Sequence, residues 1–123
     1  MKKILVAEDN PASRELMIEV LSGRGYELIE ACDGREALQK IEETEPDLVL
    51  LDIQLPILDG FTVLSEVRRN PRFANLRVLA VTANAMKEDR ESGMRAGFDA
   101  YISKPIDVVT LRLEVDRLLL KGP

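Results

Sequence analysis

The sequence contains no histidine and no tryptophan, and its only cysteine is Cys32. Histidine is the usual general base, metal ligand and phosphoryl carrier, so its absence leaves carboxylates, hydroxyls and lysine to carry any chemistry. A single cysteine cannot form an intrachain disulfide, and we expect its thiol to be buried or half-buried. Basic residues are not in excess either, since 17 Lys and Arg face 22 Asp and Glu and the net charge is −5. Direct nucleic-acid binding is therefore not expected.

Long hydrophobic runs are also missing. The first apolar run, Ile4–Ala7, is too short for the core of a signal peptide, and no later segment is long enough to span a bilayer. We therefore expect a cytoplasmic protein without membrane insertion. The length of 123 residues and the 46% hydrophobic content suit one core, and only Lys121-Gly122-Pro123 follow the last predicted helix. The expectation is one domain over residues 1–123 with no output domain.

Several short apolar runs are continuous rather than alternating, which indicates strands buried on both faces of a parallel sheet. Segments with helical spacing lie between them, and strands and helices alternate strictly. This alternation predicts an α/β fold, an open parallel five-stranded sheet with helices on both faces. The expected strands are Ile4–Ala7, Glu27–Ala31, Leu48–Leu51, Val78–Val81 and Ala100–Ser103.

Two helices have informative sequences. Asn10 before Pro11 places a capping side chain ahead of a proline at the first helical position. The last helix is expected from about Asp107 to Leu120, and apolar residues also lie away from its main buried stripe. They indicate either a partner or dimer surface or ordinary scattered surface residues, and the second is the commoner case. These residues are Val109, Leu113 and Leu120.

Polar side chains follow the strands where each one ends. Glu8 and Asp9 come after the first strand and Asp52 after the third, while the fourth ends at Thr82 and the fifth is followed by Lys104. In the common strand order 2-1-3-4-5 the first and third strands are neighbours beside the switch point, so the three acids meet there. Two charges about 4 Å apart repel by about 4 kcal/mol at an effective dielectric of 20, so the cluster needs protonation or a cation. All-oxygen ligands predict Mg²⁺.

This arrangement suits phosphoryl transfer to a carboxylate. Asp52 stands alone at the centre of the sheet and is the expected nucleophile, whereas the adjacent Glu8 and Asp9 are better placed to hold the ion. Lys104 supplies a cation for a phosphoryl oxygen, and Thr82 supplies a further donor. The phosphoryl donor has to be another molecule, because this chain has no histidine to carry the group.

Taken together, these residues resemble the receiver domains of two-component response regulators over essentially the whole chain. Each motif alone would be weak, but all four occur in the right order on the expected elements. The motifs are Glu8-Asp9-Asn10, Asp52-Ile53-Gln54-Leu55-Pro56-Ile57-Leu58-Asp59-Gly60, Thr82-Ala83-Asn84-Ala85 and Lys104-Pro105.

The resemblance implies a flavodoxin-like fold and a site in which Asp52 is the phosphoacceptor and the backbone carbonyl of Gln54 is a further Mg²⁺ ligand. It implies that Thr82 and Tyr101 are a switch pair that remodels the surface of helix four, strand five and helix five. The peptide bond between Lys104 and Pro105 is then expected to be cis. Side chains at Gln54 and Asn84 are expected to tune the rate of dephosphorylation.

The resemblance also implies partners and an activity. A sensor histidine kinase or a histidine phosphotransfer protein is the expected donor, and a downstream protein is the expected target. The chain is not expected to be a conventional enzyme, but to catalyse its own Mg²⁺-dependent phosphorylation and slow dephosphorylation. We expect a monomer or a weak phosphorylation-dependent dimer.

Three other functions fit parts of the pattern. A phosphatase that also forms an aspartyl phosphate carries Asp-x-Asp after its first strand, where this chain has Glu8-Asp9-Asn10-Pro11. A nucleotide or flavin binder needs a phosphate loop at that place, and Glu8 and Asp9 would repel a phosphate there. A degenerate receiver that only mediates contacts would not need Asp52 and Lys104. The receiver function is therefore the preferred interpretation.

Overall fold

The computed structural model describes residues 1–83 and 96–120 of the chain. Five parallel strands form one sheet in the order β2-β1-β3-β4-β5, which confirms the predicted α/β fold. The predicted fourth helix, Asn84 and the helix-four part of the predicted switch surface lie outside the described residues. The strands are β1 (Lys2–Ala7), β2 (Tyr26–Ala31), β3 (Leu48–Asp52), β4 (Arg77–Thr82) and β5 (Ala100–Ser103).

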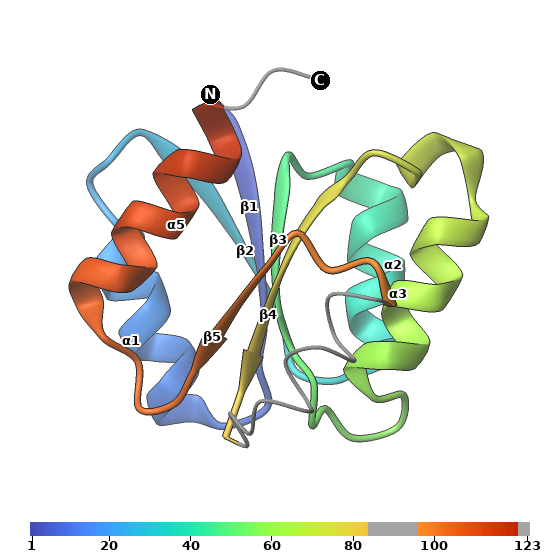
Figure 1. The fold of residues 1–123 in the computed structure, drawn as a ribbon, viewed down its shortest axis with the longest axis horizontal. Helices are drawn as coiled ribbons and strands as arrows, with labels where there is room; N and C mark the ends of the chain where they lie inside the picture. The colour runs from blue at the N-terminus through green and yellow to red at the C-terminus, as the bar shows by residue number, and fades with distance from the viewer. Residues whose placement is uncertain (84–95, 121–123) are drawn as a thin grey trace.

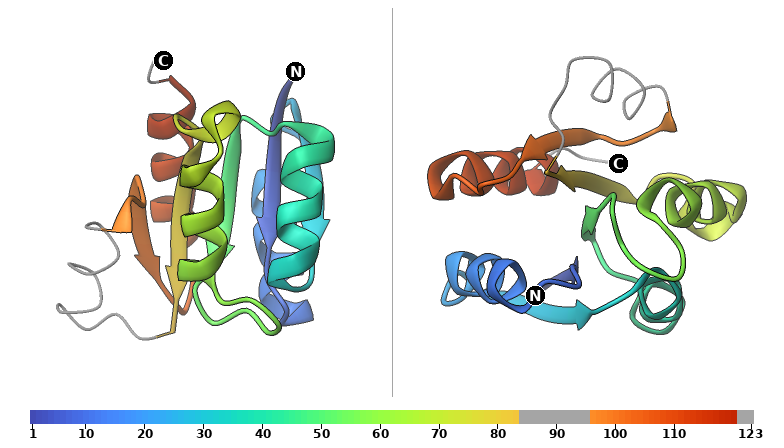
Figure 2. Two further views of the ribbon diagram at one scale, coloured as in Figure 1. Left: turned by 90° about the vertical axis from the view of Figure 1, so that its right-hand side faces the viewer. Right: turned by 90° about the horizontal axis from the view of Figure 1, so that it is seen from below.

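Helices cover both faces of this sheet. In Figure 1 helices α1 and α5 lie on one side of the strands, and α2 and α3 lie on the other. The view from below in Figure 2 shows the sheet between these two layers. The described helices are α1 (Pro11–Leu21), α2 (Gly34–Thr44), α3 (Gly60–Arg69), the short 3₁₀ helix η1 (Pro71–Phe73) and α5 (Val108–Leu120).

Side-chain caps begin the helices that follow β1, β2 and β3. Asn10 accepts a hydrogen bond from the Ser13 N–H, with Pro11 at the first position of α1, as the sequence predicted. Asp33 and Asp59 cap α2 and α3 in the same way. Each cap satisfies a backbone donor and fixes the direction of the chain as it leaves the edge of the sheet.

Two hydrophobic cores lie on the two faces of the sheet. All five residues of β3 are buried, which explains why the central strand reads as a continuous apolar run. β2 is less buried because it lies at the edge of the sheet. Cys32 follows this edge strand and is exposed, so the expectation of a buried or half-buried thiol was wrong. Its backbone N–H donates to Glu36 Oε1 at 2.8 Å.

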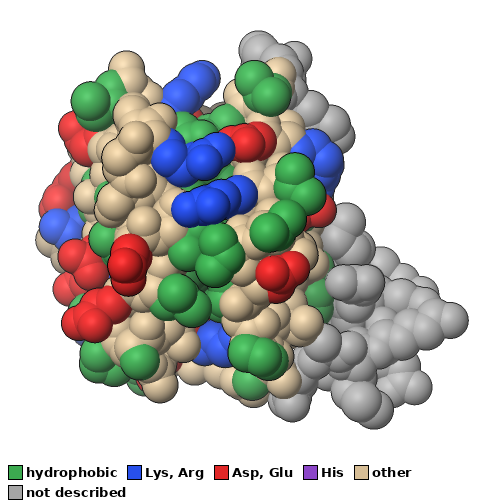
Figure 3. All heavy atoms as spheres, turned by 90° about the vertical axis from the view of Figure 1, so that its left-hand side faces the viewer, with side chains coloured by type: hydrophobic (Ala, Val, Ile, Leu, Met, Phe, Trp, Pro, Cys, Tyr) green, Lys and Arg blue, Asp and Glu red, His purple; other side chains and the backbone are tan. Residues whose placement is uncertain are grey.

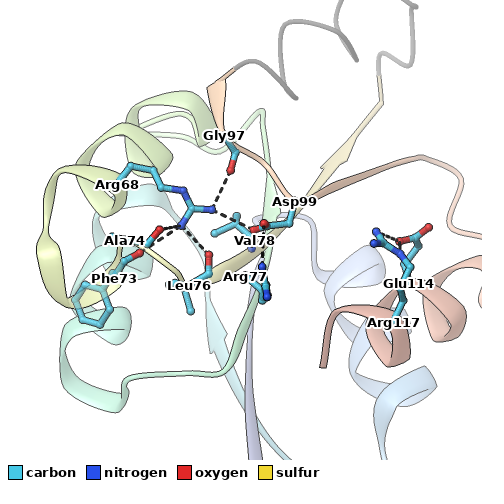
Figure 4. A network of polar contacts seen from close by, with 10 residues as sticks. All are labelled: Arg68, Phe73, Ala74, Leu76, Arg77, Val78, Gly97, Asp99, Glu114 and Arg117. Carbon is cyan, nitrogen blue, oxygen red and sulfur yellow. Dashed lines mark hydrogen bonds and ion pairs between the residues drawn. The ribbon is translucent and has the colours of Figure 1, made fainter. Parts of the chain in front are cut away.

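Arg68 of α3 ties together segments at the edge of the sheet where β4 begins (Figure 4). Its guanidinium donates to the Leu76 carbonyl oxygen at 2.7 Å, to the Gly97 carbonyl oxygen at 2.9 Å and to Asp99 Oδ2 at 3.1 Å. Asp99 also accepts from the Val78 N–H at 2.8 Å. The entry into β5 is therefore fixed to α3 and β4.

The surface of α5 carries exposed apolar residues, as the sequence predicted. Val109, Leu113 and Leu120 are 62%, 64% and 84% exposed. Figure 3 shows the side of the molecule that carries α1 and α5, where hydrophobic side chains lie between charged ones. None of the described helices has the length and apolar character needed to cross a membrane.

Candidate functional site

The register of the sheet places the acids of β1 and β3 side by side. Ala7, the last residue of β1, pairs with Leu51 of β3, so Glu8 and Asp52 follow at the same level. Asp52 is itself the last residue of β3 rather than the first residue after it. The predicted neighbourhood of the first and third strands therefore brings these carboxylates to one edge.

The next two strands bring a hydroxyl and a cation to the same edge. Asp52 pairs with Val81 of β4, and Thr82 follows one residue further along. Thr82 in turn pairs with Ser103, the last residue of β5, after which comes Lys104. Four neighbouring strands thus each end in a polar residue, or are followed by one, at the carboxyl edge of the sheet.

Carboxylate oxygens of Glu8, Asp9 and Asp52 all lie within 4.8 Å of one another. Glu8 and Asp52 are 0% and 2% exposed, whereas Asp9 is exposed. Two acids thus sit at the bottom of the site and the third lies at its solvent side. Such a cluster is costly without a cation, because burial weakens screening between like charges.

Within the described residues, Lys104 supplies a positive charge to this cluster of carboxylates. Its Nζ lies 2.6 Å from Glu8 Oε1 and 3.2 Å from Asp52 Oδ2, and its side chain is 21% exposed. Burial alone lowers the pKa of Lys104, but the Glu8 and Asp52 carboxylates outweigh burial and leave this pKa raised. The lysine therefore stays charged and bridges two of the three acids.

Glu8 is the residue of the site most affected by burial. Its pKa is raised from 4.5 to about 7, because burial and, to a smaller extent, the neighbouring Asp52 raise it more than Lys104 and the Asn10 N–H lower it. The Asn10 N–H donates to Glu8 Oε2 at 3.0 Å. Glu8 Oε1 accepts no well-directed hydrogen bond from the described residues, although Lys104 Nζ is close to it. One buried carboxylate oxygen thus still lacks a directional partner.

Backbone contacts orient the residues around Asp52. The Gln54 N–H donates to Asp52 Oδ1 at 2.8 Å, which leaves Oδ2 toward Lys104. The Lys104 N–H donates to the Thr82 carbonyl oxygen at 2.7 Å and fixes the end of β5 to the end of β4. The peptide bond between Lys104 and Pro105 is cis.

The donor set fits a hard divalent cation. It consists of three carboxylates within reach of one another, and one of them has a buried oxygen without a directional hydrogen bond. Oxygen ligands of this kind suit Mg²⁺, which is usually held by one or two carboxylates together with waters and phosphate oxygens. The residues present are therefore compatible with the Mg²⁺ expected from the sequence.

The remaining predicted residues lie in and around this edge. Thr82 is 2% exposed at the end of β4, and Tyr101 is 7% exposed on β5, where it belongs to the core that α2 and α3 cover. Gln54 is exposed two residues after Asp52, and its N–H contacts the Asp52 carboxylate.

Sequence reasoning missed Arg14, which supports the site from α1. Its guanidinium donates to the Glu8 carbonyl oxygen at 3.0 Å and to Glu30 Oε1 at 3.0 Å. The arginine therefore holds the end of β1 against the end of β2. An arginine three residues into a helix carries no distinctive sequence signal, so only the fold reveals this contact.

Comparisons with known proteins agree with this geometry. The sequence model of the response regulator receiver domain matches residues 4–116. The polar-differentiation response regulator DivK of Brucella anthropi is 41% identical over 107 residues, which are 87% of this chain and 87% of DivK. The DNA-binding dual master transcriptional regulator RpaA of Synechocystis sp. is 38% identical over 119 residues. These residues are 97% of this chain and 49% of RpaA, so the chain spans about half of that relative.

A solved structure extends the comparison to the site. The receiver domain of sensor histidine kinase PA1611 from Pseudomonas aeruginosa has a TM-score of 0.89 and 32% identity, and 98% of each chain is covered. That structure has a magnesium ion coordinated in its active-site cleft. The chain described above belongs to the receiver domain family of response regulators. Members of this family act in phosphorylation-dependent signalling rather than as conventional enzymes, and they take phosphoryl groups from histidine kinases or phosphotransfer proteins.

Proposed function

We propose that Asp52 is the phosphoacceptor of this receiver domain and that the domain comprises residues 1–123. The observation that carries the proposal is the meeting of three carboxylates and one lysine, with Lys104 Nζ 3.2 Å from Asp52 Oδ2. Family membership alone does not require an intact site, whereas this constellation supplies a nucleophile and charges for a phosphoryl group.

In the proposed reaction an oxygen of the Asp52 carboxylate attacks the phosphorus of a phosphohistidine. The new O–P bond forms as the N–P bond breaks, and the imidazole nitrogen keeps the bonding pair and takes up a proton from water. Lys104 pairs with an oxygen of the incoming group, since its ammonium already lies beside Asp52. Thr82 offers a hydroxyl from the neighbouring strand. The product is an acyl phosphate on Asp52.

The metal in this proposal is Mg²⁺, held by Glu8, Asp9, Asp52 and the Gln54 carbonyl oxygen. When bound, Mg²⁺ neutralises charge on the phosphoryl oxygens. Glu8 would lose its proton on binding the ion, because its pKa is raised. Asp9, which is exposed, would be the second carboxylate ligand and would bind from the solvent side. The domain then catalyses its own phosphorylation and the slow hydrolysis of the acyl phosphate, with Gln54 and Asn84 at the positions that set the hydrolysis rate.

The proposed output is a change of surface that selects a downstream protein partner. Thr82 and Tyr101 lie on adjacent strands, with Tyr101 paired to Ala80 in the sheet. A displacement of the Thr82 hydroxyl toward the phosphoryl group would therefore be transmitted to the neighbouring strand and to α5. The proposed donor is a sensor histidine kinase or a histidine phosphotransfer protein, which places the chain in the cytoplasm, as a monomer or a weak phosphorylation-dependent dimer.

The test is intact-protein mass spectrometry after incubation with acetyl phosphate and Mg²⁺. We expect the wild type to gain one hydroxylamine-labile phosphoryl group, and Asp52→Asn or a chelator to abolish this gain. Asp47→Asn is the matched control, because Asp47 is exposed beside the start of β3, at the opposite edge. Its Oδ2 accepts the Lys3 N–H, a contact that an amide oxygen can keep. Labelling of Asp52→Asn at the wild-type level would refute the assignment.

A further inference from the structure

The Arg14 side chain joins the acidic turn after β1 to the edge strand β2. Its Nη1 donates to the Glu8 carbonyl oxygen and its Nε to Glu30 Oε1, both at 3.0 Å. The Arg14 side chain is 18% exposed, whereas that of Glu30 is 55% exposed. The guanidinium is thus largely covered and spans a main-chain acceptor and a carboxylate on two different elements.

The same arginine closes the turn that carries Glu8 and Asp9. Its N–H donates to the Asn10 carbonyl oxygen at 2.9 Å, at the start of α1, while its side chain reaches back to the Glu8 carbonyl oxygen. Figure 1 shows this turn at the lower edge of the molecule, where β1 passes into α1. The turn is therefore fixed by both the backbone and the side chain of Arg14.

These contacts set the direction of the Glu8 side chain. The Glu8 N–H donates to the Ala31 carbonyl oxygen at 3.0 Å, and its own carbonyl oxygen accepts from Arg14. Because each peptide group is planar, the two hydrogen bonds together orient both peptide groups that flank the Glu8 Cα. The second of these groups contains the N–H of Asp9, so the contact with Arg14 also determines where Asp9 begins.

Asp9 depends on its backbone more than the other acids do. Glu8 and Asp52 are buried and packed, whereas Asp9 is exposed, so the preceding peptide group largely decides where its carboxylate lies. Mg²⁺ requires near-ideal octahedral geometry and tolerates misplaced ligands poorly. A metal site that includes both Glu8 and Asp9 therefore needs an accurately placed turn.

We propose that Arg14 is a positioning residue for the metal site, which raises Mg²⁺ affinity by holding the Glu8 carbonyl group while Glu30 orients its guanidinium. The proposal rests on the proposed function, in which Glu8 and Asp9 hold Mg²⁺ and Asp52 accepts the phosphoryl group. It gives Arg14 no part in the phosphoryl transfer itself, so Mg²⁺ affinity and the rate at saturating Mg²⁺ report on different claims.

The charge of Arg14 acts in the opposite direction to its positioning effect. A guanidinium repels a divalent cation, so loss of this charge alone would strengthen Mg²⁺ binding, whereas loss of positioning weakens it. Lysine keeps the charge but lacks the planar fork that reaches two acceptors at once. Arg14→Met and Arg14→Lys are therefore both expected to bind Mg²⁺ more weakly than the wild type, although only the first removes a charge.

The test measures the Mg²⁺ dissociation constant of the full chain by isothermal titration calorimetry. We expect Arg14→Met to raise it about tenfold and Arg14→Lys to raise it by a smaller factor. The rate of labelling with acetyl phosphate at saturating Mg²⁺ should stay within about twofold of the wild type, because only binding of the ion is affected.

Glu30 provides a second pair of variants with equal charge. Glu30→Gln keeps an oxygen that can accept from Arg14 Nε, and Glu30→Ala does not. Glu30→Ala should therefore have the higher Mg²⁺ dissociation constant of the two. Arg24→Met is the matched control, since Arg24 precedes β2 at the opposite edge of the sheet and forms a similar ion pair with Asp116 at 3.2 Å. It should leave the dissociation constant unchanged.

Three results would overturn the proposal. One is a dissociation constant of Arg14→Met at or below the wild-type value, and another is equal constants for Glu30→Ala and Glu30→Gln, which decides the matter if Arg14→Met does not fold. The third is a loss of labelling rate in Arg14→Lys that persists at saturating Mg²⁺, since Arg14 would then act on the reaction itself. Failure of the wild type to bind Mg²⁺ or to become labelled would instead contradict the proposed function.

Discussion

At the scale of single residues, Glu8 combines full burial with contact to both a cation and an acid. Its side chain is 0% exposed, with Lys104 Nζ 2.6 Å away and Asp52 within the same cluster. Burial favours the protonated acid and Lys104 favours the carboxylate, and burial has the larger effect on its pKa. Glu8 is therefore poised to change protonation when a cation enters the site.

Mg²⁺ affinity should consequently depend on pH. Because the pKa of Glu8 is raised to about 7, Mg²⁺ has to displace a proton below that pH, and affinity rises as pH rises. We expect affinity from isothermal titration calorimetry to fall about tenfold from pH 8 to pH 6. Glu8→Gln should bind more weakly and with a flatter pH profile. A wild-type affinity that is constant over this range would show that Glu8 is already ionised.

The raised pKa of Glu8 also affects the stability of the metal-free chain. This stability falls as pH rises, whereas Mg²⁺ affinity increases. A raised pKa means that the fold favours the protonated acid, so this contribution to stability is fully present below pH 4.5 and is lost as pH rises through about 7. Removal of the metal by a chelator is therefore expected to be more destabilising at pH 8 than at pH 6.

Gly34 is required for space rather than for backbone conformation. Gly34→Ala should lower the free energy of unfolding by about 2–4 kcal/mol, because its Cβ would overlap with Leu58 of the loop after Asp52. Gly25→Ala is the control, since Gly25 has φ of 83° and no atom within 4 Å of an added Cβ. Its expected loss is about 1 kcal/mol from backbone strain alone. Urea denaturation distinguishes the two, and equal losses would contradict the packing argument.

At the scale of secondary-structure elements, much of the sheet was predictable and the connections were not. Continuous apolar runs identify β3 and β4 because both faces of a central parallel strand are covered. The predicted first strand began at Ile4, but backbone pairing with β2 extends β1 back to Lys2. Backbone pairing is independent of side-chain polarity, so the hydrophobic pattern cannot reveal such an extension.

In the candidate site, too, some features were predictable from the sequence and others were not. The acids, Thr82 and Lys104 were predictable because they follow strands whose order fixes their meeting place. The contact of Lys104 with both Glu8 and Asp52 depends on side-chain packing, which no sequence pattern specifies. The positive φ of Ile57 was equally hidden, since isoleucine is among the residues least expected there.

Arg68 connects three elements and should therefore have a measurable effect on stability. Arg68→Met should lower the free energy of unfolding by about 2–3 kcal/mol, because Asp99 and several carbonyl groups lose a charged donor that is shared by α3, β4 and the start of β5. Arg69→Met is the neighbouring control, since Arg69 is 75% exposed and its pair with Glu66 should contribute at most about 0.5 kcal/mol. Guanidinium denaturation measures both, and similar losses would show that the Arg68 contacts drawn in Figure 4 stabilise the fold no more than an exposed ion pair does.

At the scale of the whole molecule, cation binding and folding are linked because the acids come from different strands. Mg²⁺ at 100 times its dissociation constant should raise the free energy of unfolding by about 2.7 kcal/mol, since the unfolded chain cannot gather these ligands. Thermal unfolding with and without EDTA measures this effect. Asp9→Asn should remove most of the Mg²⁺-dependent increase, and an increase that survives in this variant would place the ion elsewhere.

The register of the sheet also has a consequence for biosynthesis. Glu8, Asp9 and Asp52 are translated in the first half of the chain, whereas Lys104 directly follows β5, which pairs with β4 at the edge of the described sheet. A nascent chain in which β5 has not yet emerged from the ribosome therefore holds Asp52, the proposed acceptor, without Lys104. Competence to receive a signal should appear late in synthesis, after the acceptor has been made, so unfinished chains would not compete with mature ones for the donor.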